Sequence, residues 1–282
     1  MINYGDIPEE YTQLHSAAIV ILPVPYDGTS TWIKGSDKGP DAILNASANV
    51  ELYDMDTDSE VYTLGIHTAA PVNENSSPEK MVESVYNKAT EYLRQEKFLV
   101  TIGGEHSISI GLFRAFSEKF TSLTILQIDA HTDLRQIYNE SKFNHACVMA
   151  RAREFCTIVQ VGIRSTDISE KPFIDPRKTF TAEKIHKRQI KIADIIDQLT
   201  ENVYLTIDLD GFDPSVIPST GTPEPGGLTW YEVTGLIDEV NKSRNIVGFD
   251  IVELCPNENE KSSDFIAARL IYKILSYKFS KK

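Results

Sequence analysis

Short apolar runs alternate with longer amphipathic segments along this chain. The runs are rich in Val, Ile and Leu, which is typical of strands buried in a parallel sheet. The predicted strands are Ala17–Leu22, Lys97–Ile102, Leu123–Ile128, Thr157–Val161, Val203–Ile207 and Asn245–Ile251. The predicted helices are Ser77–Arg94, Ser107–Lys119, Ala182–Leu199, Trp230–Lys242 and Ser262–Tyr277. This alternation predicts βαβ units and therefore an α/β fold around a mostly parallel sheet.

One helix carries a clear start signal. Ser77 is a favourable N-cap, and Pro78 fits the first helical turn, where its missing N–H group has no partner to lose. Apolar residues then recur at helical spacing from Met81 to Tyr92. The segment Tyr138–His145 shows no such periodicity, and we predict that it forms a polar loop.

Length and composition narrow the class of protein. A chain of 282 residues, 41% of them hydrophobic, can bury one large core, and we treat residues 1–282 as a single domain. The first residues, MINYGDIPEE, lack the basic and apolar regions of a signal peptide, and no stretch approaches the roughly 18 apolar residues of a membrane-spanning helix. We therefore expect no membrane association.

Charge and cysteine content add two expectations. Acidic residues outnumber basic ones by 41 to 28, for a formal net charge of -13. Nucleic-acid binding requires a basic surface, so nucleic acid is not expected as a partner, whereas a cationic ligand would be attracted. Cys147, Cys156 and Cys255 are odd in number and show no CxxC spacing, which favours a reducing cytoplasm.

Polar motifs follow four of the apolar runs where the predicted strands end. They are GGEHS at 103–107, DAHTD at 129–133, DLDGFDP at 208–214 and VELCP at 252–256. Functional groups in open α/β sheets gather at the carboxyl ends of the strands. We therefore expect these four motifs to form one site.

Two of these motifs are rich in metal ligands. Asp129, His131 and Asp133 alternate along the chain, so they project to the same side for as long as the backbone stays extended. Asp208 and Asp210 repeat this pattern. Acidic side chains packed this closely repel one another strongly unless cations neutralise them. The spacing therefore predicts a metal site.

The number of ligands indicates more than one ion. With His106 there are six candidates, which is too many for one closed structural zinc site. Two ions that share carboxylates fit better, and a set rich in oxygen with some imidazole suits Mn²⁺, with Zn²⁺, Fe²⁺ and Co²⁺ as alternatives. Two ions about 3.5–4 Å apart activate water for attack on carbon, so we expect a hydrolase.

The three ordered strings GGEHS, DAHTD and DLDGFDP resemble the ureohydrolase family, which includes arginases, agmatinases, guanidinobutyrases and formiminoglutamases. GSDKGPDAI at 35–43 resembles the family's N-terminal GxxxGPxAI element, and GTPEPGGLT at 221–229 adds to the match. The resemblance spans roughly residues 20 to 256. It implies a three-layer α/β/α sandwich of the arginase type, two Mn²⁺ per chain, and a homo-oligomer, either a trimer or a hexamer.

Carried over residue by residue, the resemblance also implies roles for individual side chains. His106 and Asp133 would bind one ion, His131 and Asp210 the other, and Asp129 and Asp208 would bridge the two.

Three of the implied roles are catalytic. Glu253 matches the family's carboxylate that pairs with the substrate guanidinium, for which a planar carboxylate is well suited. Asp133 would carry a proton to the departing amine. His145 matches a loop histidine that exchanges protons with solvent, although Ala146 stands where arginases usually have glycine.

The choice of substrate depends on the residues around Asp133. Arg135 stands where arginases have an asparagine that contacts the amino acid head group, which disfavours arginine as the substrate. Arg135 can instead form an ion pair with the carboxylate of 4-guanidinobutyrate or formiminoglutamate. However, DLR at 133–135 and SKFNHACVM at 141–149 look most like the compact prokaryotic agmatinases, some relatives of which accept aminopropylagmatine. We therefore expect a small cationic guanidino substrate, agmatine first, cleaved to urea and putrescine in polyamine biosynthesis.

Two functions of other classes remain as alternatives. The α/β metal scaffold also resembles that of zinc-dependent deacetylases, but a deacetylase needs one catalytic ion, whereas this chain has ligands for two. A non-catalytic guanidino-binding protein would have no use for bridging aspartates. Metal content and urea release distinguish these alternatives from a ureohydrolase.

Overall fold

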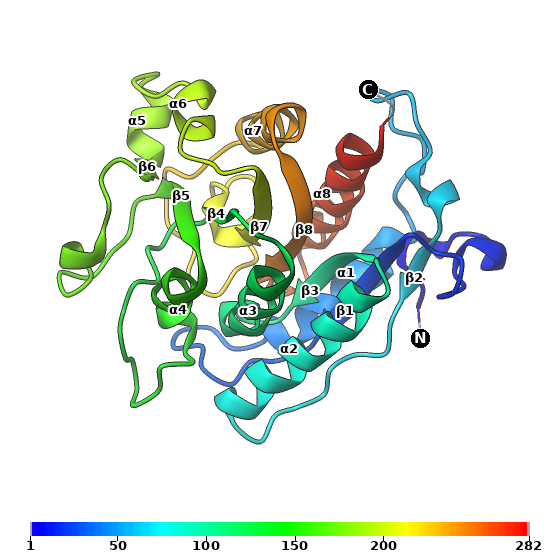
Figure 1. Ribbon diagram of the computed structural model, residues 1–282, viewed down its shortest axis with the longest axis horizontal. Helices are drawn as coiled ribbons and strands as arrows, with labels where there is room; N and C mark the ends of the chain where they lie inside the picture. The colour runs from blue at the N-terminus through cyan, green and yellow to red at the C-terminus, as the bar shows by residue number, and fades with distance from the viewer. Residues whose placement is uncertain (1, 281–282) are drawn as a thin grey trace.

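A computed structural model describes residues 2–280 and contains one eight-stranded sheet, all of whose strands are parallel (Figure 1). The strand order is β2-β1-β3-β8-β7-β4-β5-β6. The strands are β1 (Ile19–Val24), β2 (Ile66–Thr68), β3 (Phe98–Gly103), β4 (Leu123–Ile128), β5 (Thr157–Ile163), β6 (Thr179–Thr181), β7 (Asn202–Asp208) and β8 (Asn245–Val252). The central strands are apolar because both of their faces are covered.

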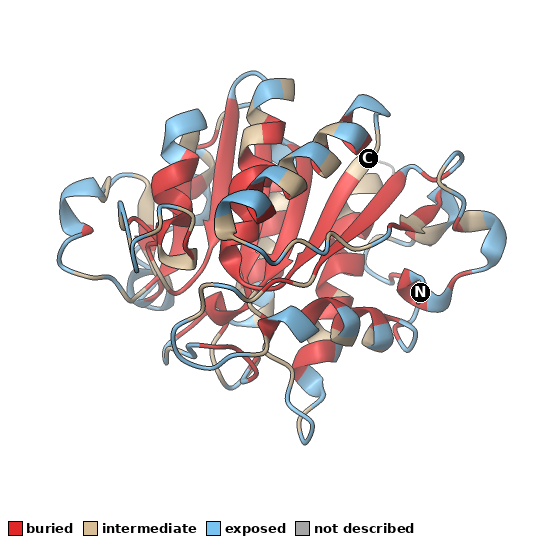
Figure 2. Cartoon of the chain, turned by 90° about the horizontal axis from the view of Figure 1, so that it is seen from below, coloured by how far each residue is buried: buried red, intermediate tan, exposed pale blue. Residues whose placement is uncertain are grey.

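Eight α-helices of the described chain cover the two faces of this sheet. They are α1 (Gly39–Ser47), α2 (Pro78–Arg94), α3 (Ser109–Lys119), α4 (Val148–Phe155), α5 (Ala182–His186), α6 (Ile192–Ile196), α7 (Trp230–Ser243) and α8 (Ser262–Phe279). The buried residues of α2, α3 and α4 share one core cluster, and those of α1 and α5 to α8 share the other. In Figure 2 the strands and the inward sides of the helices are buried, while the outward sides are exposed. The predicted three-layer α/β/α sandwich is confirmed.

The predicted strands agree with the structure to within two residues at each end. The edge strands β2 and β6 were not predicted, because three residues are too few to show a period. Helices α1 and α4 were not predicted either. The proposed loop between Tyr138 and His145 is a tight turn closed by Tyr138 and Ser141, and His145 already begins a short 3₁₀ helix, η6 (His145–Cys147).

The prediction of one helix over Ala182–Leu199 is wrong. The chain forms the two short helices α5 and α6 instead, because Arg188 adopts a left-handed conformation with φ of 55°. The Arg188 amide donates to the Ile185 carbonyl, and the Gln189 amide donates to the Lys184 carbonyl, which ends α5 as a left-handed C-cap does. In the described part of the chain, no helix is both long enough and apolar enough to cross a bilayer.

Four strands at the centre of the sheet end level with one another. Ile102 of β3 pairs with Ile251 of β8, Ile251 with Ile207 of β7, and Ile207 with Ile128 of β4. The residues that follow these four isoleucines therefore emerge side by side at one edge of the sheet. They belong to the four polar motifs of the sequence.

Candidate active site

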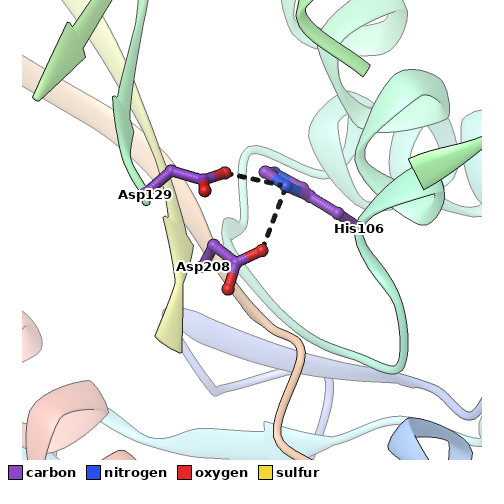
Figure 3. A group of neighbouring side chains, drawn as sticks. All are labelled: His106, Asp129 and Asp208. Atoms are coloured by element: carbon purple, nitrogen blue, oxygen red, sulfur yellow. Dashed lines mark ion pairs between the residues drawn. The ribbon is translucent and has the colours of Figure 1, made fainter. Parts of the chain in front are cut away.

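His106 lies at the centre of one group of ligands, together with Asp129, Asp133 and Asp208. The 3₁₀ helix η5 (His106–Ile108) directs its ring toward the ends of β4 and β7. The Nδ1 atom lies 3.3 Å from Asp129 Oδ2, 3.1 Å from Asp133 Oδ2 and 3.4 Å from Asp208 Oδ2. Figure 3 shows the carboxylates of Asp129 and Asp208 both directed toward the nitrogen of this ring. We call these four residues the His106 group.

The geometry of the His106 group fits a metal ion. His106 Nδ1 is fully buried, and it makes no hydrogen bond with the described residues. A buried polar atom without a partner is unfavourable, whereas a lone pair that faces three carboxylates is the arrangement of a metal ligand. His106, Asp129 and Asp208 offer ligand atoms that all lie within 4.8 Å of one another.

His131 forms a second group with Asp129 and Asp210. Its Nδ1 atom lies 3.0 Å from Asp210 Oδ2 and 3.6 Å from Asp129 Oδ1. Their ligand atoms also lie within 4.8 Å of one another. We call these three residues the His131 group. Asp129 belongs to both groups, as the predicted bridging role requires, whereas the geometry joins Asp208 to the His106 group alone.

The backbone gathers these ligands by turns, and the expected extended alternation is wrong. β4 ends at Ile128, and Asp133 has a left-handed φ of 51°. β7 ends at Asp208, and Asp210 lies in the 3₁₀ turn η8 (Leu209–Gly211). The Asp208 carboxylate accepts the amide of Asp210 at 2.9 Å, and the Asp129 carboxylate accepts the amide of His131 at 2.5 Å. Each strand-end aspartate therefore holds the turn that presents the next ligand.

Negative charge accumulates in this site. Burial, and then the charge on Asp129, raises the pKa of Asp133 to about 7, although His106 opposes the shift. Burial and the charges of Asp210 and Asp129 raise the pKa of Asp208 well above its usual range. Cations between the carboxylates would remove this repulsion. The electrostatics and the buried Nδ1 atom therefore agree that two metal ions fit this site.

A cleft of about 260 Å³ opens above the ligands, and Glu253 forms part of its wall. Glu253 has a left-handed φ of 65°, which turns its side chain off the end of β8. Its Oε1 atom accepts the amide of His106 at 2.7 Å, and its own amide donates to Gly104 at 2.8 Å. Gly221 lies next to the other oxygen of this carboxylate, because a Cβ atom built on Gly221 would be 3.9 Å from Glu253 Oε2. Glu253 is thus held in place by one oxygen beside the metal ligands.

His145 lies on another wall of the cleft. Thr29 accepts the backbone amide of His145 at 3.0 Å, and its hydroxyl lies 3.2 Å from His145 Nδ1. The same hydroxyl donates to the buried carboxylate of Glu105 at 2.9 Å. Burial is the main cause that lowers the pKa of His145 to about 4. His145 is therefore a neutral base near neutral pH.

Arg135 also lines the cleft, but two carboxylates already neutralise it. Its guanidinium lies 3.4 Å from Asp167 and 3.5 Å from Glu170, and it stacks over the Tyr138 ring at 4.5 Å. Glu170 is buried and accepts the Leu134 amide at 2.8 Å, whereas Asp167 is 39% exposed. Arg135, Asp167 and Glu170 together carry one net negative charge. The outer part of the cleft is thus acidic despite its arginine.

Sequence reasoning missed the residues that support the ligands. Gln127 donates to Asp129 Oδ2 at 2.6 Å, and Thr206 lies 2.9 Å from His106 Nε2. Arg164 donates to the carbonyls of Asp210 and Glu224, at 2.7 and 2.8 Å, and so holds the turn that carries Asp210. Gln127 and Thr206 are polar residues inside apolar strands, and that position was the available signal.

Comparisons with known proteins agree with this geometry. The model of the arginase family matches residues 17–276. The chain is 38% identical to the N(1)-aminopropylagmatine ureohydrolase of Synechocystis sp., with 95% of this chain and 92% of that protein covered. It is 33% identical to the agmatinase of Pyrococcus horikoshii, with 93% of this chain and 92% of that protein covered. The structure of the agmatine ureohydrolase of Thermoplasma volcanium superposes with a TM-score of 0.87 at 30% identity, over 99% of this chain and 94% of that one.

Proposed function

Because this chain belongs to the arginase family and is a hydrolase of guanidino groups, we propose that its substrate is a guanidinoalkylamine, a linear guanidinium compound whose far end is a second cation. Agmatine is the first candidate, and urea and putrescine would be its products.

The charge of the outer cleft is the observation that carries this choice. An unpaired Arg135 would favour a substrate that ends in a carboxylate, but Asp167 and Glu170 counter its charge. Asp167 is the most accessible of the three charges and lines the cleft. A carboxylate tail would meet a net negative charge there, whereas an ammonium tail would be attracted.

The members of the arginase family depend on two metal ions. In this chain the His106 group would hold one ion and the His131 group the other, with Asp129 shared between them. When bound, the two ions supply Lewis acidity and an activated water molecule. The mix of carboxylate oxygens and two imidazoles favours Mn²⁺ among the candidate metals.

Glu253 would orient the substrate. Its Oε1 atom is anchored to the His106 amide, so the carboxylate is presented to the cleft in one orientation. A planar carboxylate pairs with a planar guanidinium through two parallel hydrogen bonds. This pairing would hold the guanidinium carbon over the metal ligands and make the attack effectively intramolecular.

The proton transfers follow from the overall reaction. One water adds its oxygen to the guanidinium carbon, the bond from that carbon to the alkyl-substituted nitrogen breaks, and both protons of the water finish on the departing amine. Asp133, whose carboxylate lies 3.1 Å from His106 Nδ1, would carry a proton to that nitrogen. His145 is a neutral base on the cleft wall, and it would exchange protons with solvent.

N(1)-aminopropylagmatine is a second candidate. Relatives at 38% and 35% identity carry its name, and agmatinase relatives follow at 33% and below. Trp32 lines the same cleft and is 75% exposed, so an apolar surface is available there for a longer chain. This substrate has the same charge at its guanidinium end and one additional cation in its tail.

Steady-state kinetics with substrates of different tails test the proposal. Agmatine, N(1)-aminopropylagmatine and 4-guanidinobutyrate share a guanidinium on an alkyl chain and differ in tail charge. We expect a higher kcat/KM for either amine than for the carboxylate. A preference for 4-guanidinobutyrate would overturn the assignment and make Arg135 the residue that selects the substrate.

A further inference from the structure

A buried chain of hydrogen bonds runs from His106 into the centre of the sheet. His106 Nε2 lies 2.9 Å from the Thr206 hydroxyl on β7, and that hydroxyl donates to Asp250 Oδ1 on β8 at 2.7 Å. The three residues are at most 1% exposed. Thr206 and Asp250 pair directly in the register of β7 and β8.

The direction of these hydrogen bonds follows from counting protons. A threonine hydroxyl has one proton, and a carboxylate only accepts, so the Thr206 proton goes to Asp250. The Thr206 oxygen must then accept a proton from His106 Nε2. A neutral imidazole with its proton on Nε2 has its lone pair on Nδ1. That is the atom that faces Asp129, Asp133 and Asp208.

Asp250 is itself held as an acceptor. The Tyr204 hydroxyl donates to Asp250 Oδ2 at 2.9 Å, and the buried Tyr204 ring packs against Phe113 and Phe116. Burial raises the pKa of Asp250 to about 6, so the group is a carboxylate above neutral pH. Both of its oxygens are therefore occupied by hydroxyl donors from one strand.

We propose that Asp250, acting through Thr206, is a positioning residue that holds His106 in the tautomer competent to bind metal, and so sets the metal affinity of the His106 group. The inference rests on the metal positions proposed above. It predicts an asymmetry, because the His131 ring contacts Asp129 and Asp210 and makes no hydrogen bond with Thr206 or Asp250 among the described residues.

The asymmetry can be tested with Thr206→Val, which replaces the hydroxyl by a methyl group of similar shape. Conserved partners of metal-binding histidines typically contribute about 10- to 100-fold to metal affinity. We expect one of the two Mn²⁺ ions per chain to bind about 10- to 100-fold more weakly, and the other to keep its affinity. Electron paramagnetic resonance at limiting Mn²⁺ should then show an isolated ion where the wild type shows a coupled pair. Thr206→Ser should restore the wild-type affinities and spectrum.

Thr101→Val is the matched control. Thr101 is equally buried and pairs with Asp250 from the other side, on β3, but its hydroxyl makes no hydrogen bond with the described residues. The same substitution there should leave both affinities unchanged. It separates loss of the hydrogen bond from the general effect of a valine beside Asp250.

Asp250→Ala gives a second test with a directional outcome. The Thr206 hydroxyl is then released from Asp250 and can donate to His106 Nε2, which places the imidazole proton on Nδ1. Metal affinity of the His106 group should fall at least as far as in Thr206→Val. Equal weakening of both ions, or unchanged affinity in either variant, would overturn the inference. Metal binding is measured without substrate, so a chain that binds both ions but releases no urea would contradict the proposed function alone.

Discussion

Glu253→Gln removes the charge that we assign to the substrate guanidinium and leaves the shape of the side chain intact. The amide oxygen of glutamine can still accept the His106 amide, which Glu253 Oε1 accepts at 2.7 Å, so the loop should keep its conformation. The remaining amide group would then direct N–H donors at a cation. Loss of one partner of a buried charged pair costs about 2–5 kcal/mol. Because Glu253 is only half-buried and keeps one hydrogen bond, we use about 2–3 kcal/mol.

At about 1.36 kcal/mol for each factor of ten, this energy corresponds to a decrease in kcat/KM of roughly 30- to 160-fold. The assay is urea release from agmatine under initial-rate conditions, with the metal content of each preparation measured alongside. Metal content should remain that of the wild type. Glu258→Gln is the control, because Glu258 lies on the same connection, is exposed, and does not line the cleft. A kcat/KM within threefold of the wild type in Glu253→Gln would refute the assigned role.

Three further substitutions test other parts of the account. Asp167→Asn should raise the KM for agmatine by about two- to fivefold, because an ion pair with a partly exposed carboxylate contributes up to about 1 kcal/mol to binding. The KM for 4-guanidinobutyrate should not rise, since its tail is not a cation. An equal change with both substrates would argue against recognition of the tail. His145→Asn should lower kcat by about 10²-fold, with partial rescue by imidazole in the buffer, and an unchanged kcat would exclude a role in proton transfer. Lys273→Met should destabilise the fold by about 1–3 kcal/mol in denaturant unfolding, because the buried Asp54 carboxylate loses the Lys273 donor at 3.0 Å and keeps only Arg269, at 3.3 Å, as a cationic partner. Burial raises the pKa of Asp54, but the hydrogen bonds from Lys273 and Thr57 lower it by more, so the pKa lies below its ordinary value. In the wild type the stabilisation by this pair is therefore present above the ordinary pKa of aspartate and is lost as the pH falls through the lowered pKa of Asp54. A difference in stability between wild type and variant that does not change with pH across that window would contradict this role.

The fold was predictable where hydrophobic runs were long enough to show their period. β4 and β7 are covered on both faces, so apolar residues make up four of the six positions of LTILQI and four of the seven of NVYLTID. The break at Arg188 was not predictable in the same way. Its left-handed conformation depends on the hydrogen bonds that close α5, and arginine has no intrinsic preference for that conformation.

The candidate site, too, was predictable from the sequence only in part. Its imidazoles and carboxylates follow strand ends, and the rule that parallel strands present their carboxyl ends together was enough to gather them. Thr206 and Asp250 lie inside strands more than 40 residues apart in the sequence, and only the register of β7 and β8 places one against the other. Their contribution therefore follows from pairing between strands, which a single sequence does not specify.

Stepwise addition of Mn²⁺ to metal-free protein, with urea release from agmatine and N(1)-aminopropylagmatine measured at each step, tests the central claim most directly. We expect no urea without metal and full activity only when two ions are bound per chain, because the His106 group and the His131 group share Asp129. Full activity with a single ion, or no urea from either substrate with both positions filled, would contradict the account.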